Sequence, residues 1–247
     1  MVLDNSFSYV LGYIAAWSLL ISIAAFTLKI LKKNKNTGWL YILVVNLAFA
    51  LIGILALALV MEGYYGFFYD EPDSYGLLLT SQRWFKRHYH LNNAGFRDDK
   101  DYFLAKGAGK RRIVFIGDSF TAGHGVKNIG DRFTGIIEAR LKKEKGNNYE
   151  VYTLAKNGWD TYEELNYLAE LDETGFQANT VILCYTMNDI GWASDESMAI
   201  LKSLYNMKPD NWLLRHSFFL NFLYARMSIF PRQEVKDYYE WLSGFYT

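Results

Sequence analysis

The chain has 247 residues, with 26 Lys and Arg against 26 Asp and Glu and a hydrophobic fraction of 51%. The balanced charge supplies no basic field for nucleic acid, so we expect no nucleic-acid partner. The single cysteine, Cys184, excludes an intrachain disulfide framework and any multi-cysteine metal site. A chain this apolar with only 3 prolines is also too hydrophobic to be disordered.

Two long apolar segments stand near the N-terminus. Tyr9–Leu28 and Trp39–Met61 contain no charged residue, and neither shows a polar stripe at the helical period. A hydrocarbon core of about 30 Å needs roughly 20 apolar helical residues, so each segment is long enough to cross it. We therefore predict a transmembrane hairpin over residues 1–61, with spans at about 9–31 and 39–61 and the lipid bilayer as a partner.

The charges that flank the spans predict the orientation of this hairpin. A signal peptide would begin with basic residues, whereas the segment before the first span carries Asp4 and neither Lys nor Arg. Lysines lie between the two spans and acidic residues follow the second one: Lys29, Lys32, Lys33 and Lys35, then Glu62, Asp70, Glu71 and Asp73. Under the positive-inside rule the lysine loop is cytoplasmic, and the remainder of this two-pass chain lies on the extracytoplasmic side.

Strand and helix patterns alternate after a connector over residues 62–110, which contains the turn-prone stretch Asn92–Gly95. Short apolar runs predict buried strands, and apolar residues at helical spacing predict helices between them. The predicted strands are 112–117, 149–154 and 180–185, and the predicted helices are 131–145 and 162–171. Asp160 or Thr161 would cap the second helix, with Glu163 and Glu164 in its first turn.

This order predicts an α/β domain over residues 111–247, built on a parallel sheet that helices cover on both faces. After Tyr185 the chain is helical and aromatic in pattern through Tyr246, without a further strand. Sites in open α/β sheets lie beyond the carboxyl ends of the strands. The segments to examine are therefore the three that follow the predicted strands.

Each of these segments carries a residue suited to acyl chemistry. Ser119 follows the first strand directly, where a helical turn would expose its hydroxyl as a nucleophile. Gly158 follows the second strand and offers an unobstructed backbone N–H, and Asn188 follows the third and offers an amide donor. Together they predict a nucleophile with a three-donor oxyanion hole.

Other kinds of site fit the sequence less well. The stretch from Gly117 to Gly123 does not match the dinucleotide fingerprint, and Gly109-Lys110 lacks the rest of a phosphate-binding loop. The aspartates at positions 118, 131, 189 and 195 have no known cation-loop spacing. We therefore expect neither a metal nor a cofactor.

The three strand ends resemble the first three blocks of the SGNH (GDSL-type) hydrolases. The string IVFIGDSFTAGHGV, preceded by Asn93–Arg97, is similar to membrane-attached bacterial members. The resemblance implies a flavodoxin-like three-layer domain in which Ser119 is the nucleophile. It also implies that the Ser119 N–H, the Gly158 N–H and the Asn188 side chain stabilise the oxyanion. The implied substrate bears an ester, on a lipid, a polysaccharide O-acyl group or a small molecule.

One block of that family is missing from the sequence. The family places an Asp-x-x-His near the C-terminus as the general base and its orienting carboxylate, and no histidine here stands in that motif. His88 and His90 fit a solvated connector, which leaves His124 and His216 as candidates for an otherwise unknown base. The domain is therefore expected to be incomplete at its C-terminal end.

Two functions follow from these patterns. The first is a membrane-anchored ester hydrolase or acyl-transfer protein that has little activity alone, because its histidine block is absent. The alternative is a non-catalytic membrane protein that uses the same sheet as a binding or assembly module.

Overall fold

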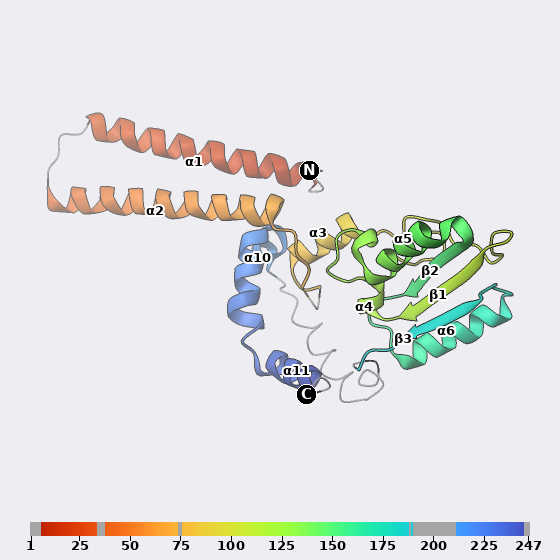
Figure 1. The fold of residues 1–247 in the computed structure, drawn as a ribbon. Helices are drawn as coiled ribbons and strands as arrows, with labels where there is room; N and C mark the ends of the chain where they lie inside the picture. The colour runs from red at the N-terminus through yellow and green to blue at the C-terminus, as the bar shows by residue number, and fades with distance from the viewer. Residues whose placement is uncertain (1–5, 34–37, 74–75, 188, 190–210, 245–247) are drawn as a thin grey trace. The chain divides into compact units, whose positions relative to one another are not determined.

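The computed structural model describes residues 6–33, 38–73, 76–187, 189 and 211–244 (Figure 1). The chain divides into two compact units. Met1–Arg83 and Pro209–Ser228 form the first, which we call the hairpin unit, and Trp84–Lys208 and Ile229–Thr247 form the second, which we call the sheet unit. The chain thus passes between the units more than once. The domain boundaries expected after residues 61 and 110 remain predictions.

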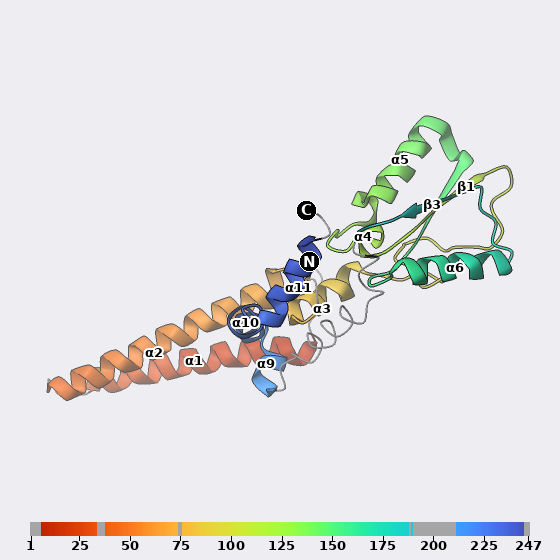
Figure 2. The ribbon, with the colours of Figure 1, turned by 90° about the horizontal axis from the view of Figure 1, so that it is seen from below.

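Two long helices dominate the hairpin unit. Helix α1 (Phe7–Lys33) and helix α2 (Trp39–Gly63) lie side by side in both ribbon views (Figures 1 and 2). Both helices are long and apolar enough to cross a membrane. Their apolar side chains are mostly exposed, in contrast to those of a core helix in a soluble protein. The two predicted spans lie within these helices.

The C-terminal end of α2 continues into a short π-helix, η1 (Tyr64–Phe68). Here the side chains of Tyr9 and Tyr13 come so close to the backbone that a Cβ at Gly66 or Gly63 would collide with their hydroxyl oxygens. The absence of a side chain at these two glycines therefore allows the start of α1 to pack against the end of α2.

Glu62 joins a late segment of the chain to this end of the hairpin. Its carboxylate accepts hydrogen bonds from the Ser217 hydroxyl at 2.6 Å and from the N–H groups of Phe218 and Phe219 at 2.9 Å each. The carboxylate thereby caps helix α10, because it satisfies N–H groups that have no partner within the helix. The elements of this late segment are α9 (Trp212–His216), α10 (Phe218–Tyr224) and η4 (Ala225–Ile229).

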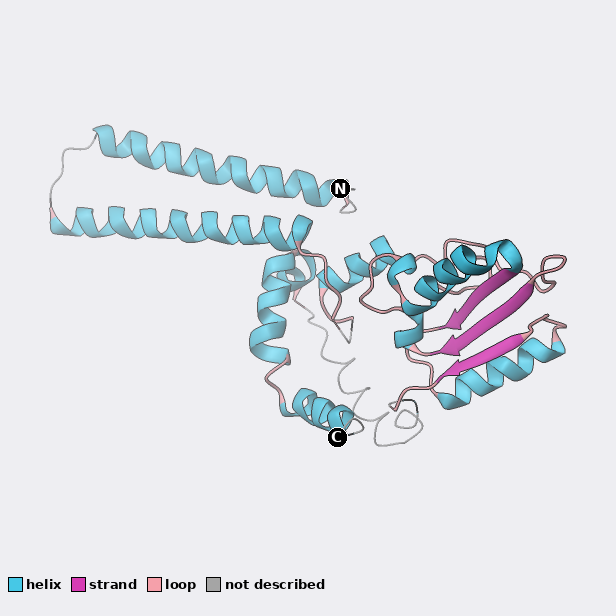
Figure 3. Cartoon of the chain, in the orientation of Figure 1, coloured by secondary structure: helices cyan, strands magenta, loops and turns pink. Residues whose placement is uncertain are grey.

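The sheet unit contains three parallel strands in the order β2-β1-β3 (Figure 3). They are β1 (Arg111–Gly117), β2 (Tyr149–Ala155) and β3 (Thr180–Cys184). Each lies within one residue of the strand expected from the sequence. Gly117 pairs with Ala155 and with Cys184, so the three strands end at the same edge of the sheet.

Helices cover the two faces of the sheet, as predicted (Figures 1 and 2). Helix α5 (Phe133–Lys145) lies on one face, where Phe133 meets Phe115 edge to face. Helix α6 (Thr161–Glu173) lies on the other, and Asp160 and Glu163 form the expected cap through a reciprocal capping box. The domain is therefore a three-layer α/β structure.

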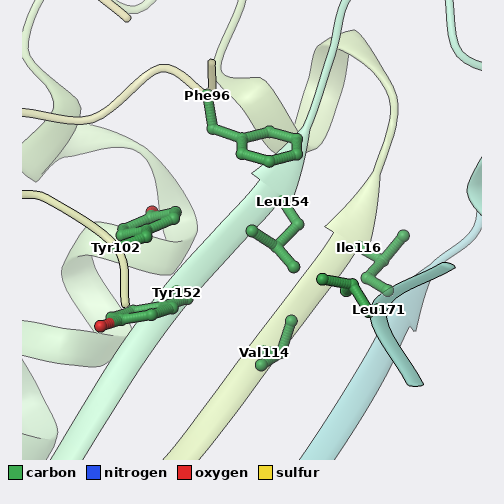
Figure 4. Packing of buried hydrophobic residues seen from close by; sticks show 7 residues of the cluster. All are labelled: Phe96, Tyr102, Val114, Ile116, Tyr152, Leu154 and Leu171. Carbon is green, nitrogen blue, oxygen red and sulfur yellow. The ribbon is translucent and has the colours of Figure 1, made fainter. Parts of the chain in front are cut away.

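Side chains of the connector complete the core on the α6 side. Figure 4 shows Phe96 and Tyr102 beside residues of β1, β2 and α6. The rings of Tyr102 and Tyr152 stack in parallel, with their centroids 4.0 Å apart. Phe96 is fully buried. The connector therefore contributes to the hydrophobic core of the sheet unit rather than only linking the unit to the hairpin.

Two expectations about burial and helix content were wrong. The apolar third strand was predicted to be buried, yet Val181, Ile182 and Leu183 are 40%, 38% and 44% exposed. The reason is that β3 is an edge strand, which pairs only with β1 in the described part of the sheet. The connector also contains a helix that was not predicted, α3 (Leu79–His88). Among residues 211–244, the expected helical pattern is confirmed and ends in α11 (Gln233–Gly244).

Candidate active site

Ser119 lies at the start of a single helical turn that follows β1 directly. Asp118 precedes this turn, helix α4 (Ser119–Ala122), in an extended conformation, and its Oδ1 accepts a hydrogen bond from the N–H of Phe120 at 2.9 Å. The turn ends at Gly123, whose φ of 78° lies in the left-handed region that favours glycine. Strand, cap and turn thus hold Ser119 beyond the carboxyl end of the central strand.

The buried side chain of Arg97, a residue that is 1% exposed, contacts the turn and the loop that follows it. Its guanidinium donates hydrogen bonds to the carbonyls of Ala122, Gly123 and Val126 on the loop after Ser119. It also donates to the carbonyl of His88 at 2.8 Å, which joins helix α3 to the same loop. A single buried cation therefore determines where the loop after the serine lies.

The second strand end meets the first beside this turn. The N–H of Lys156 donates to the carbonyl of Gly117 at 3.3 Å. Two residues later Gly158 adopts φ +82°, and its backbone is exposed. The Asn157 amide lies between the Tyr89 hydroxyl, at 3.2 Å, and the His124 ring nitrogen Nδ1, at 3.0 Å. Gly158 thus follows β2 at the same edge at which Ser119 follows β1.

The third strand end is joined to the first through side chains. The hydroxyl of Thr186 lies 3.1 Å from Oδ2 of Asp118 and 2.8 Å from Oδ1 of Asp189. Asn188, the predicted amide donor, lies outside the described residues. The described neighbours Thr186 and Asp189 connect the residues after β3 to Asp118, which precedes the turn that carries Ser119.

Three buried carboxyl groups lie near this edge of the sheet. Asp118, Asp189 and Glu164 are each at most 1% exposed. Burial, reinforced by the neighbouring charges of Asp189 and Asp118, raises the pKa of Glu164 to about 7. Burial likewise raises the pKa of Asp189 above its usual range. Neither carboxyl oxygen of Glu164 has a hydrogen-bond partner among the described residues.

The two candidate bases lie in different surroundings. His124 belongs to the loop after Ser119, and its backbone N–H donates to the Ser119 carbonyl at 2.9 Å. Its ring contacts Asn157 and packs on Phe85 with the ring centroids 5.3 Å apart. His216 belongs to the hairpin unit, where it is exposed and stacks on Trp212 at 4.7 Å. Within the described ranges, no three His, Cys, Asp or Glu side chains are grouped so that they could hold a metal ion.

Comparison with protein families agrees with this geometry. Residues 115–211 match the model of the GDSL-like lipase/acylhydrolase family. The chain carries a GDSL-like hydrolase domain. The matched range includes Ser119, Gly158 and Asn188, and it begins within β1. Comparisons with curated proteins and with solved structures give no significant match.

The GDSL-like domain also holds residues near the candidate site that the sequence did not predict as site residues. Glu164 was expected in the first turn of α6, where it lies, and its side chain is fully buried there. It lies on the same helical face as Leu168 and Leu171, at spacings of four and seven residues, and that pattern could have indicated its burial. Thr186 carries no such signal, because its role depends on a contact between two strand ends that only the sheet brings together.

Proposed function

We propose that the protein is a membrane-anchored serine hydrolase that acts on an ester. The proposal rests on one observation: three strand ends converge on one edge of the sheet, with Ser119 on the turn after the central strand. In this proposal Ser119 is the nucleophile. Its own N–H, the Gly158 N–H and the Asn188 side chain stabilise the oxyanion of the tetrahedral intermediate.

The reaction needs two displacement steps at the ester carbonyl. In the first, Ser119 Oγ bonds to the carbonyl carbon, its proton passes to a base, and the alcohol leaves with a proton. In the second, water attacks the acyl-enzyme, the acid is released, and Oγ regains a proton. A serine without a strong base remains a poor nucleophile, so we expect slow hydrolysis from this polypeptide alone.

The two long apolar helices support a location in the membrane. We propose that α1 and α2 cross the bilayer, with the lysine loop in the cytoplasm and the GDSL-like domain on the other side. This location would give the domain access to ester-bearing lipids, polysaccharide O-acyl groups and small esters. The chemistry common to all three is an acyl ester at an exposed carbonyl.

The direct test is hydrolysis of p-nitrophenyl acetate by the full chain in lipid nanodiscs. We expect slow release of nitrophenol that Ser119→Ala reduces to the uncatalysed rate. Ser243→Ala is the matched control, because that exposed hydroxyl donates to the carbonyl of Glu240, away from the candidate site. Hydrolysis that persists in Ser119→Ala would contradict the assignment of the nucleophile.

The alternative, a binding or assembly module, is favoured by one observation, the absence of an Asp-x-x-His from this sequence. A fluorophosphonate probe separates the two functions. A weakly active hydrolase becomes labelled slowly at Ser119, which attacks phosphorus and expels fluoride, and Ser119→Ala abolishes this labelling. A binding module stays unlabelled while its fold is intact.

A further inference from the structure

The chain returns to the hairpin late in its sequence. Residues 211–228, which we call the return segment, belong to the hairpin unit. Glu62 at the end of α2 accepts hydrogen bonds from the Ser217 hydroxyl at 2.6 Å and from N–H groups at the start of α10 at 2.9 Å. The buried side chain of Asn221 accepts from the N–H of Leu79 at 2.9 Å. The return segment is therefore attached to this unit at two separate points.

Glu62 marks the place where the apolar part of α2 ends. It is the first charged residue after the uncharged run Trp39–Met61. A carboxylate is costly inside hydrocarbon, so the hydrocarbon of a bilayer crossed by α2 must end close to this residue. The start of α10 is bonded to Glu62 and therefore lies at the same boundary between acyl chains and headgroups.

Helix α10 runs along this boundary rather than away from it. In Figure 1 it runs crosswise to α2, and in Figure 2 it is viewed along its own axis beside the two long helices. Both helices belong to the hairpin unit, so their directions can be compared. A helix that begins at the boundary and runs crosswise to a spanning helix lies in the plane of the membrane surface.

Aromatic rings join α10 to the end of the hairpin. The ring of Tyr65 stacks on that of Phe222 with the centroids 4.2 Å apart, and the ring of Tyr9 meets that of Phe218 edge to face at 5.3 Å. The guanidinium of Arg226 lies over the Phe222 ring, 5.2 Å from its centroid. Tyrosine rings and long cationic side chains are typical of the headgroup layer of a membrane protein.

The return segment also exposes large apolar side chains. Trp212, Leu213 and Met227 are 68%, 54% and 70% exposed. Such side chains gain more from the layer between headgroups and acyl chains than from water. The sequence of the segment contains two arginines and no acidic residue, which complements anionic lipid. A symmetric contact with a second copy would instead bring like charges together, so these features favour lipid.

We propose that the return segment lies in the headgroup layer of the bilayer, where Glu62 holds it. Trp212, Leu213 and Met227 contact the part of the acyl chains next to the headgroups. The partner of this surface is the phospholipid bilayer itself. The inference rests on the proposed crossing of the bilayer by α1 and α2, and it adds a second attachment to lipid far along the chain from those helices.

Depth-dependent fluorescence quenching tests this placement in the full chain. In a Cys184→Ala background, Leu213→Cys or Met227→Cys carries a nitrobenzoxadiazole label in vesicles of phosphatidylcholine and phosphatidylglycerol. The vesicles contain a lipid with a nitroxide either next to the headgroup or at the end of the acyl chain. We expect the nitroxide next to the headgroup to quench the label at both positions more strongly than the deep one.

Two further positions bracket the expected result. Leu19→Cys places the label on an exposed residue in the middle of α1, where the deep nitroxide should quench more strongly. Lys142→Cys places it at an exposed position of α5, where neither nitroxide should quench. Labels at positions 213 and 227 that behave like the label at position 142 would overturn the inference.

Substitution of Glu62 tests how the segment is held. Glu62→Ala removes the acceptor of the N–H groups at the start of α10, so quenching at position 213 should fall toward that at position 142. Glu62→Gln keeps one acceptor oxygen and should lose less. Glu234→Ala removes an exposed carboxylate from α11 and should change nothing. Undiminished quenching in Glu62→Ala would overturn the role of Glu62.

The inference and the proposed membrane location fail in different ways. A label at position 19 that the deep nitroxide does not quench would overturn both, because α1 would then not cross the bilayer. Quenching at position 19 without quenching at position 213 would leave the crossing in place and overturn the inference alone. An unquenched label at position 213 with blue-shifted emission would indicate a protein partner in place of lipid. None of these results depends on hydrolysis by Ser119, which is measured separately.

Discussion

Arg97 illustrates how much a single side chain contributes to the candidate site. It lies in a run, Asn93–Arg97, that the sequence already linked to the strand ends. The structure places its guanidinium over the rings of Tyr89 and Trp84, at 5.1 Å and 5.5 Å from their centroids. Burial and the nearby Arg132 lower the pKa of Arg97. Its charge is compensated mainly by backbone carbonyls, whose oxygens would otherwise be buried without donors.

We therefore expect Arg97→Ala to lower the free energy of unfolding by about 3 kcal/mol or more, since several carbonyls lose their donor at once. Arg97→Lys should recover only part of this loss, because an ammonium cannot reproduce the planar fork of donors. Urea unfolding of the full chain in detergent, followed by tryptophan fluorescence, measures the change.

Arg111 supplies the matched control for this prediction. It is an exposed arginine at the first position of β1, so Arg111→Ala should change stability by no more than about 0.5 kcal/mol. An Arg97→Ala variant as stable as Arg111→Ala would show that the loop after Ser119 does not depend on the guanidinium.

At the scale of elements, helix α6 combines a predicted feature with an unexpected one. Asp160 accepts hydrogen bonds from the N–H groups of Tyr162 and Glu163 at 2.7 Å and 3.2 Å, as the sequence pattern indicated. The next residue of the helix is Glu164, whose carboxyl group is buried. A helix that begins with an acidic cap thus places a second acid near the candidate site.

Glu164 predicts a pH dependence of stability with a definite sign. Its pKa rises from 4.5 to about 7 on folding, so the folded state holds a proton that the unfolded chain has released between these values. Stability should therefore decrease as pH rises from 4.5 to about 7, by at most about 3 kcal/mol from this group. Glu164→Gln should remove that part of the slope in melting curves recorded over the range.

Glu170→Gln is the corresponding control, because Glu170 lies on the exposed side of the same helix. Its melting temperature should follow the wild type at every pH. A Glu164→Gln variant with the wild-type slope would mean that this carboxyl is ionised in the folded protein.

The strands and long helices could be predicted from the sequence, because apolar runs and helical periodicity are local patterns. Helix α3 was missed because its sequence, LTSQRWFKRH, is mostly polar and buries Trp84 through contacts made elsewhere in the chain. The exposure of β3 depends on its place at the edge of the sheet. The strand ends predicted Ser119 and Gly158 as site residues, whereas the link from Thr186 to Asp118 depends on the register of β1 and β3.

At the scale of the whole molecule, the orientation of the hairpin is the property most open to test. In a Cys184→Ala background, Lys142→Cys introduces a thiol at an exposed position of α5, and Lys33→Cys introduces one at an exposed lysine of the predicted cytoplasmic loop. A membrane-impermeant maleimide applied to intact cells should label position 142 at once. Position 33 should react only after permeabilisation. The reverse order of labelling would place the GDSL-like domain in the cytoplasm.

The way the chain passes between its two units has a mechanical consequence. It leaves the hairpin unit after Arg83, returns at Pro209, and leaves again after Ser228. The returning segment is held by the Glu62 carboxylate, and by Asn221, whose side chain accepts from the N–H of Leu79 at 2.9 Å. The polypeptide therefore connects the sheet unit to the hairpin unit at more than one point. A protease that cut only the stretch just after Arg83 would nick the polypeptide without separating the sheet unit from the hairpin unit.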